Sequence, residues 1–387
     1  MTQLPVAPLG EPVDWIDTPT ALAEAAARWR GASAIGIDTE FVRERTFYPR
    51  LGLLQVADGE RSALVDPLAL PDLEPLRQVL VDPAILKVVH SPSEDMEVLF
   101  HRFGEFPSPL FDTQVGAALA GLEAAMSYQR VVRELLGVEL EKGETRTDWL
   151  RRPLSPAQIQ YAAHDVELLL PLYREIKSRL DAAGRLAWLL EESGRLRDAT
   201  RFLPPAEDAY LRLGGLGGLD RRQLGALRAL AAWRERQARE RDLPRNFVLK
   251  ESALVTLARR QPQRLAELAD VPDLPPKQVE RYGETLLRIL REVRQLPIEE
   301  LPATRPRGAR DERGRELVDR MQEAVRLRAE ALQVSAPLLA SRRDLKQLLS
   351  CPLEALPPPA LAGWRWQQIR DDLEPMLAEA RAQGIVG

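Results

Sequence analysis

Short runs of apolar and β-branched residues dominate the chain between residues 34 and 113. Runs of this length, bounded by polar and turn-forming residues, are typical of β-strands. The loops between the first three are too short for a crossover helix, so we expect those three to form an antiparallel meander. The five predicted strands are AIGID at 34–38, LGLLQVA at 51–57, SALVD at 62–66, LKVVH at 86–90 and LFDT at 110–113.

Helical periodicity alternates with the later strands and then replaces them. LEPLRQVL at 73–80 and SEDMEVLFHRF at 93–103 show apolar residues three and four apart, with Ser93 as the expected N-cap of the second helix. After Thr113 strand patterns nearly vanish and helical patterns continue to the end of the chain. The sequence therefore predicts an α/β N-terminal domain, with helices against a mixed sheet, followed by all-α helical domains.

Proline and glycine divide the helical part into segments. Pro204 and Pro205, followed by LGGLGGLD at 213–220, interrupt regular structure, so a new domain should begin near Leu219. Four helices are predicted from there to residue 294, and a second linker rich in proline, glycine and arginine covers 301–314. A third segment follows over about 315–380. Its faint similarity to the second suggests a possible repeat.

Composition excludes several classes of protein. The chain has 387 residues and one cysteine, so it can form neither an intramolecular disulfide nor a thiolate zinc cluster. No run of about 18 apolar residues is present, and the first residues show no signal peptide. We therefore expect a cytoplasmic protein that does not bind membranes. The length is compatible with two or three globular domains.

Charge is distributed unevenly between the two halves. Residues 1–200 contain 21 Lys and Arg against 31 Asp and Glu, whereas residues 201–387 contain 33 against 27. This asymmetry is what we expect if one part holds carboxylates for chemistry and the other binds a polyanion. The alternative is that the arginine-rich helices are simply solvated.

Two acidic residues at the end of the first predicted strand are the strongest candidates for chemistry. Asp38 and Glu40 are two apart, and residues i and i+2 of a strand point to the same face. Their carboxylates could therefore share one divalent cation, which would offset their repulsion. The alternative is an exposed strand end with two solvated acids.

Two further acidic positions lie on predicted helices. Asp95 is in a first helical turn, where an anion is also ordinary capping chemistry. Tyr161 and Asp165 are four apart and so share one helical face, which amphipathic helices also produce by coincidence. The order of these motifs along the chain is more specific than any one of them. A strand with Asp-x-Glu comes first, an Asp at the start of a helix follows, and a later helix carries Tyr-x-x-x-Asp.

This order resembles the DEDD exonucleases, and the surrounding residues resemble the ribonuclease D family. The resemblance covers about residues 34–180 densely, through IGIDTEFVRERTFYPRLGLLQVADG, HSPSEDMEVLF and KGETRTDWLRRPLSPAQIQYAAHDVELLLPLY. ALRALAAWRERQARERDLPRNFVLK resembles the helical nucleic-acid-binding module called HRDC, and the segment ending in LAGWRWQQI a more divergent copy. The implied domains are a ribonuclease H-like exonuclease domain at 1–205, a first HRDC domain at 206–298 and a second at 299–387.

The resemblance implies hydrolysis at an RNA 3′ end with two divalent ions, Mg²⁺ or Mn²⁺. Asp38, Glu40 and Asp165 would ligate one ion, and Asp38 and Asp95 the other. Tyr161 would orient the attacking water, which places the chain in the tyrosine subclass.

The resemblance also implies a substrate, tRNA precursors with a free 3′ end. We expect the protein to be a monomer. Substrate contacts are expected at six positions, although Phe41 could equally be a core residue: Phe41, Gln55, Lys142, Arg146, Arg234 and Arg241. Trp233 and Phe247 are expected to be core aromatics. A DNA 3′–5′ exonuclease and a non-catalytic RNA-binding scaffold are the alternative functions.

Overall fold

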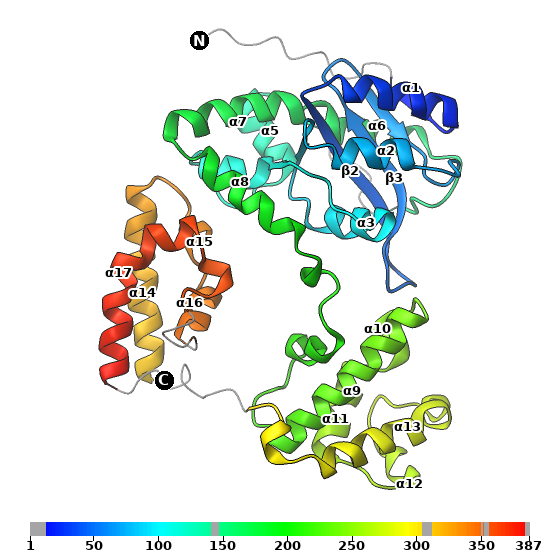
Figure 1. Ribbon diagram of the computed structural model, residues 1–387, viewed down its shortest axis with the longest axis vertical. Helices are drawn as coiled ribbons and strands as arrows, with labels where there is room; N and C mark the ends of the chain where they lie inside the picture. Colours follow the sequence, from blue (N-terminus) through cyan, green and yellow to red (C-terminus); the bar gives the residue numbers. More distant parts are fainter. Residues whose placement is uncertain (1–12, 141–146, 304–311, 350, 352–355, 384–387) are drawn as a thin grey trace. The chain divides into compact units, whose positions relative to one another are not determined.

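The computed structural model describes residues 13–140, 147–303, 312–349, 351 and 356–383. The chain divides into two compact units. The first combines the described parts of 1–42, 51–197 and 306–387, and the second combines 43–50 with the described part of 198–305. Figure 1 shows the chain coloured along the sequence, with helices and strands labelled. No described helix is both long enough and apolar enough to cross a membrane.

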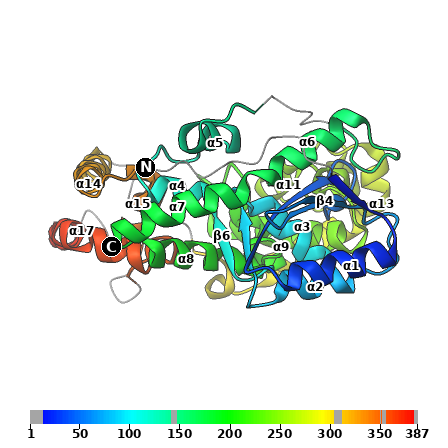
Figure 2. The same cartoon turned by 90° about the horizontal axis from the view of Figure 1, so that it is seen from above.

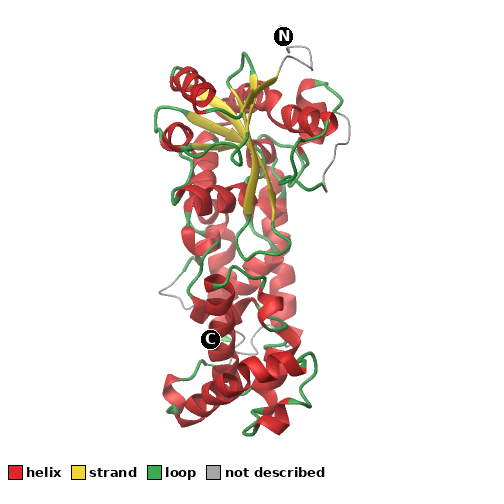
Figure 3. Cartoon of the chain, turned by 90° about the vertical axis from the view of Figure 1, so that its right-hand side faces the viewer, coloured by secondary structure: helices red, strands yellow, loops and turns green. Residues whose placement is uncertain are grey.

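A mixed six-stranded sheet forms the centre of the first unit, and all the strands of the described chain belong to it (Figure 3). The strand order is β1-β4-β3-β2-β5-β6. β3 and β4 pair antiparallel as predicted, whereas β1 with β4, β2 with β5 and β5 with β6 are parallel. The strands are β1 (Val13–Ile16), β2 (Ala34–Val42), β3 (Arg50–Ala57), β4 (Ser62–Val65), β5 (Leu86–Val89) and β6 (Leu110–Asp112).

Helices cover the sheet. α1 lies beside α2, α6 packs against β2 and β4, and α7 packs against β2 and β5 (Figures 1 and 2). The expected N-cap of α3 is wrong by one residue, because Pro92 occupies that position and Ser93 begins the helix. The helices are α1 (Pro19–Arg30), α2 (Glu74–Val81), α3 (Ser93–Phe103), α4 (Thr113–Leu119), α5 (Tyr128–Leu136), α6 (Pro156–Glu167), α7 (Leu169–Ala183) and α8 (Leu186–Gly194), with the 3₁₀ turn η1 (Arg195–Arg197).

A buried lysine joins the loop before β5 to the loop before β6. The Lys87 side chain on β5 is fully buried, and its ammonium donates hydrogen bonds to the backbone carbonyls of Asp82 at 2.7 Å, Ile85 at 2.6 Å and Ser108. Burial lowers the pKa of Lys87 to about 8. The three carbonyls satisfy its three donors, which is what a buried ammonium requires.

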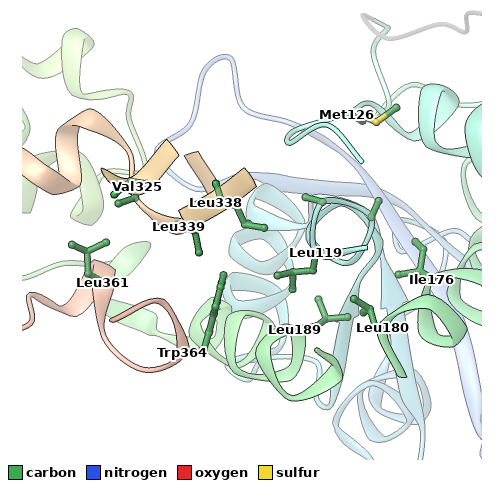
Figure 4. Packing of buried hydrophobic residues seen from close by; sticks show 14 of the residues in the cluster. Leu119, Met126, Ile176, Leu180, Leu189, Val325, Leu338, Leu339, Leu361 and Trp364 are labelled. Carbon is green, nitrogen blue, oxygen red and sulfur yellow. The ribbon is translucent and has the colours of Figure 1, made fainter. Parts of the chain in front are cut away.

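The C-terminal helices share one hydrophobic core with the exonuclease-like part of the first unit. Leu338, Leu339 and Trp364 belong to the same buried cluster as Leu119 and Leu189 (Figure 4). The Trp188 and Trp364 rings stack with centroids 4.7 Å apart. These helices are α14 (Glu312–Ala331), α15 (Ala336–Leu339), α16 (Arg342–Leu349) and α17 (Trp364–Ala382), with the 3₁₀ turn η6 (Pro359–Leu361).

The second unit is helical and has its own core. α9 begins with a capping box, in which the Asp220 side chain accepts from the Gln223 backbone N–H. The segment 43–50 is part of this unit, and the Phe47 side chain is buried in its core. The elements are α9 (Arg221–Glu240), α10 (Arg245–Val248), α11 (Glu251–Arg260), α12 (Leu265–Leu268) and α13 (Pro276–Gln295), with 3₁₀ turns η2 (Ala199–Arg201), η3 (Ala206–Arg212) and η4 (Ile298–Glu300).

Candidate active site

Strand β2 and helix α6 bring three predicted carboxylates together. Each of Asp38, Glu40 and Asp165 offers one carboxylate oxygen, and these oxygens lie within 4.8 Å of one another. Alternation along β2 puts the first two on one face. α6 holds the third against the strand because its start is fixed by a capping box between Ser155 and Gln158 and by Pro156 in the first turn.

Asp95 lies near this group without being one of the three. Its carboxylate accepts a hydrogen bond from the Thr39 hydroxyl, and its charge is among those that raise the pKa of Asp38. Thr39 is buried between the two acids of β2 and thereby links that strand to the first turn of α3. Nothing in the sequence pairs Thr39 with a residue 56 positions away, so this contact was not predicted.

The four carboxyl groups have raised pKa values because burial and repulsion from neighbouring carboxylates both disfavour the charged forms. Burial, followed by the charges of Asp95, Asp165 and Glu40, raises the pKa of Asp38 well above its ordinary value. Burial and the same kind of repulsion raise the pKa of Glu40 to about 8 and that of Asp165 to about 7. Burial raises the pKa of Asp95 to about 6, against the lowering effect of the Thr39 hydrogen bond.

Tyr161 completes the group from the same face of α6. Its phenol donates a hydrogen bond to Asp165, and burial together with the charges of Asp165 and Glu40 raises its pKa. The phenol therefore stays protonated at neutral pH. Its ring packs near buried Trp149, with centroids 6.2 Å apart, which fixes the side chain against the cluster formed with Leu53 and Leu64.

Tyr128 is a site-supporting residue that sequence reasoning missed. Its hydroxyl donates to the His164 carbonyl at 3.2 Å and accepts from the Leu168 N–H at 3.3 Å. It therefore bridges the junction of α6 and α7 immediately around Asp165. Asp112 accepts hydrogen bonds from the backbone N–H groups of Ser91 and Gln114 and caps α4, so its role is structural.

The predicted substrate contacts occupy different environments. Phe41 is half-buried at the end of β2, whereas Gln55 on β3 is fully buried, and neither of its amide atoms has a hydrogen-bond partner among the described residues. Arg234 is buried and donates to the Leu249 carbonyl at 3.1 Å. Arg241 donates a hydrogen bond to the Tyr282 hydroxyl. Lys142 and Arg146 lie outside the described residues.

The prediction for the two aromatics of the second unit is half right. Trp233 is partly buried and packs edge to face on Tyr282, with centroids 5.1 Å apart. The prediction of a core position for Phe247 is wrong, because its side chain is 60% exposed. α10 has only four residues, so an apolar position in it is not fixed by the helical periodicity used for longer helices.

The donor set fits a divalent cation. Three carboxylate oxygens in one small volume are the ligands that hard cations such as Mg²⁺ prefer. The raised pKa values show that the protein alone does not neutralise these groups, and a bound cation would favour their charged forms. The site therefore suits metal-dependent chemistry.

Comparison with known proteins agrees with this geometry. A 3′-5′ exonuclease family model matches residues 13–181, and an HRDC domain model matches residues 223–290. Ribonuclease D of Escherichia coli (strain K12) is 40% identical over 368 residues, which cover 94% of this chain and 98% of that protein. Ribonuclease D of Pseudomonas paraeruginosa is 39% identical over 372 residues, covering 95% and 98%.

Solved structures give the same result. The crystal structure of Escherichia coli RNase D, described as an exoribonuclease involved in structured RNA processing, has a TM-score of 0.88 at 39% identity and covers 95% of this chain and 99% of that one. The catalytic core of RRP6 from Trypanosoma brucei, in its mutant C496S, shares the fold with a TM-score of 0.58 at 24% identity, covering 76% and 85%. The chain therefore belongs to the ribonuclease D family and is a hydrolytic 3′–5′ exoribonuclease.

Proposed function

We propose that this chain trims the 3′ ends of tRNA precursors, acting as a monomer and releasing 5′-mononucleotides with two divalent cations. The observation that carries the proposal is the convergence of Asp38, Glu40 and Asp165, whose carboxylate oxygens lie within 4.8 Å of one another. Asp95 is close enough for its charge to raise the pKa of Asp38. The Escherichia coli relative is an exoribonuclease involved in structured RNA processing, which supports a folded RNA as substrate.

Each residue of the site has a distinct part in this proposal. When bound, two cations would supply the positive charge that activates water and stabilises the leaving 3′ oxygen. Asp38, Glu40 and Asp165 would hold the first cation, and Asp38 and Asp95 the second. Tyr161 orients the water as a hydrogen-bonding phenol, because its raised pKa makes it a poor base at neutral pH.

Two residues beside the site are proposed to hold the terminal nucleotide. The half-buried Phe41 ring follows Glu40 directly and would stack on the last base. The buried Gln55 amide, which has no partner among the described residues, would hydrogen bond the nucleotide after neighbouring side chains move. Lys142 and Arg146 are proposed phosphate contacts from the sequence alone.

The first experiment tests the metal-dependent chemistry. Purified protein is incubated with a 5′-labelled RNA carrying an unpaired 3′ end, with Mg²⁺ or Mn²⁺, and products are resolved at single-nucleotide resolution. We expect stepwise shortening that EDTA and Asp38→Asn abolish. Glu24→Gln, an exposed charge removal on α1, is the matched control and should cleave like the wild type. Continued shortening by Asp38→Asn would refute the mechanism.

The second experiment tests the substrate. A tRNA precursor with a short 3′ extension is compared with an unstructured RNA and with a DNA strand of the same sequence. We expect trimming of the precursor to pause near the folded acceptor stem and the DNA to be cut more slowly, because the 2′-hydroxyl distinguishes the two sugars. Equal rates on RNA and DNA would favour the alternative of a DNA exonuclease.

A further inference from the structure

A pocket of the second unit combines positive charge with a buried, incompletely satisfied arginine. The pocket has a volume of about 400 Å³, and we call it the arginine pocket. All its lining residues belong to the second unit. The charged ones are Arg43, Arg212, Arg234 and Arg245 against Glu235 and Glu251.

Arg234 is a buried arginine of this pocket with few partners. Its side chain is 3% exposed, and its guanidinium donates to one backbone carbonyl, that of Leu249. Its Nε is buried with no hydrogen-bond partner among the described residues, and none of their carboxylates forms an ion pair with it. A buried guanidinium with no described carboxylate in direct contact is costly, so the pocket is suited to receive an anion.

The charges of Glu235 and Glu251 favour the charged form of Arg234 without forming an ion pair with it, because each carboxylate is hydrogen bonded to other groups. Glu235 is 1% exposed and accepts from Arg239 at 2.9 Å and from Arg245 at 2.6 Å. The second acidic residue, Glu251, accepts from the Gly214 backbone N–H at 2.6 Å. Four arginines against two acids therefore leave excess positive charge around the pocket.

The segment 43–50 forms one wall and is held firmly in place. The backbone N–H groups of Phe47 and Tyr48 donate to one oxygen of Asp242 at 2.9 and 3.0 Å. The guanidinium of Arg245 lies over the Phe47 ring, 4.5 Å from its centroid. Arg43 of this wall follows the carboxylate Glu40 by three residues in the chain, so the pocket and the catalytic strand share one continuous stretch of sequence.

An exposed aromatic ring lies on the helix that borders the pocket. Arg245 and Asn246 of α10 line the pocket, and Phe247, the next residue, is 60% exposed. α10 packs beside α9, which carries Arg234 (Figure 1). One short helix thus carries both a cationic residue of the pocket and an exposed ring, and proteins hold single-stranded nucleic acid with this combination, a phosphate on the cations and a base on the ring.

We propose that the arginine pocket binds a backbone phosphate of the RNA substrate while the adjoining base stacks on Phe247. The inference rests on the proposed function and deepens it, since it assigns a specific docking site for the strand being trimmed. Arg234, Arg212 and Arg43 contact the phosphate. Arginine suits this role because its planar fork pairs with two phosphate oxygens.

The test measures binding of a fluorescently labelled single-stranded RNA to the full-length protein in EDTA, where no cleavage is expected, over a series of KCl concentrations. Arg212→Gln changes an exposed residue of the pocket and should lower the slope of log affinity against log salt by about 0.7. Phe247→Ala should weaken binding about 5- to 150-fold with the slope unchanged. Arg264→Gln, whose side chain is 81% exposed in the same unit but outside the pocket, is the matched control and should bind like the wild type.

Two further measurements separate the possible outcomes. Thermal unfolding in inorganic phosphate, with chloride of equal ionic strength as reference, shows whether a free anion occupies the pocket. Phosphate stabilisation lost in Arg212→Gln, together with wild-type RNA binding by that variant, would assign the pocket to free phosphate and overturn the proposal. Wild-type affinity and slope in both Arg212→Gln and Phe247→Ala would also overturn it. Absence of nucleotide release by the wild type, with the binding effects present, would instead refute the proposed function.

Discussion

The repulsion within the carboxylate group predicts that Glu40→Gln stabilises the metal-free protein. The pKa of Glu40 rises from its ordinary 4.5 to about 8, chiefly through burial and then through Asp165 and Asp95. Each unit of pKa corresponds to about 1.4 kcal/mol, so the ceiling is about 5 kcal/mol. Solvent reaching this half-buried side chain reduces the gain to on the order of 2 kcal/mol.

The pH dependence has a definite sign. Because the folded-state pKa of Glu40 is raised, its favourable contribution is complete below pH 4.5 and is lost as pH rises through about 8. The variant should therefore gain little over the wild type near pH 5 and most near pH 9. Differential scanning calorimetry in EDTA, following the transition of the first unit, measures this difference.

Added Mg²⁺ should reverse the order of the two proteins. A cation bound to the folded wild type stabilises it by mass action, whereas Glu40→Gln lacks one ligand and should gain less. Glu24→Gln removes the same charge from the surface and should stay within about 0.5 kcal/mol of the wild type. A Glu40→Gln protein that is folded yet no more stable than the wild type at pH 9 in EDTA would refute the reasoning.

Three further substitutions test single contacts. Tyr161→Phe removes the hydroxyl group that donates to Asp165, so kcat on RNA should fall by about 10²-fold with little change in KM. A kcat within twofold of the wild-type value would contradict the positioning role of Tyr161. Lys87→Met should cost on the order of 3 kcal/mol in urea unfolding because it strips three carbonyls of their donor. Lys177→Met, which removes a 41% exposed ammonium paired with Asp181, should cost less than about 1 kcal/mol. Gln55→Met should stabilise the free enzyme by about 1 kcal/mol and raise KM, and an unchanged KM would remove Gln55 from the substrate site.

The strands of the exonuclease-like part could be predicted because their apolar runs are short and separated by turn signals. All five predicted strands are present, and the sixth, β1, was missed because Val13–Ile16 is short and contains Asp14. The carboxylates on β2 and α6 follow from two local periods, i+2 on a strand and i+4 on a helix. Local spacing thus identifies each pair, but only the fold brings Asp38 and Asp165 together.

Long-range packing could not be predicted from the same patterns. The buried face of α17 was visible as helical periodicity, yet nothing in LAGWRWQQI indicates that Trp364 stacks on Trp188. Likewise the segment 43–50 follows β2 without a break in composition, although its Phe47 belongs to the core of the second unit. An apolar residue shows that it needs a partner, but it does not show which surface provides one.

The two electrostatic features of the chain impose opposite requirements on a polyanionic substrate. The group of Asp38, Glu40, Asp95 and Asp165 repels phosphate until cations neutralise it, and protons compete with those cations because the pKa values of Glu40 and Asp165 lie at about 8 and about 7. The arginine pocket attracts phosphate with no metal present, since Arg234 and its arginine neighbours outnumber the acids around them. RNA binding and RNA cleavage should therefore separate: binding in EDTA would weaken with salt, whereas cleavage would require the divalent cation and would increase as pH rises toward 8.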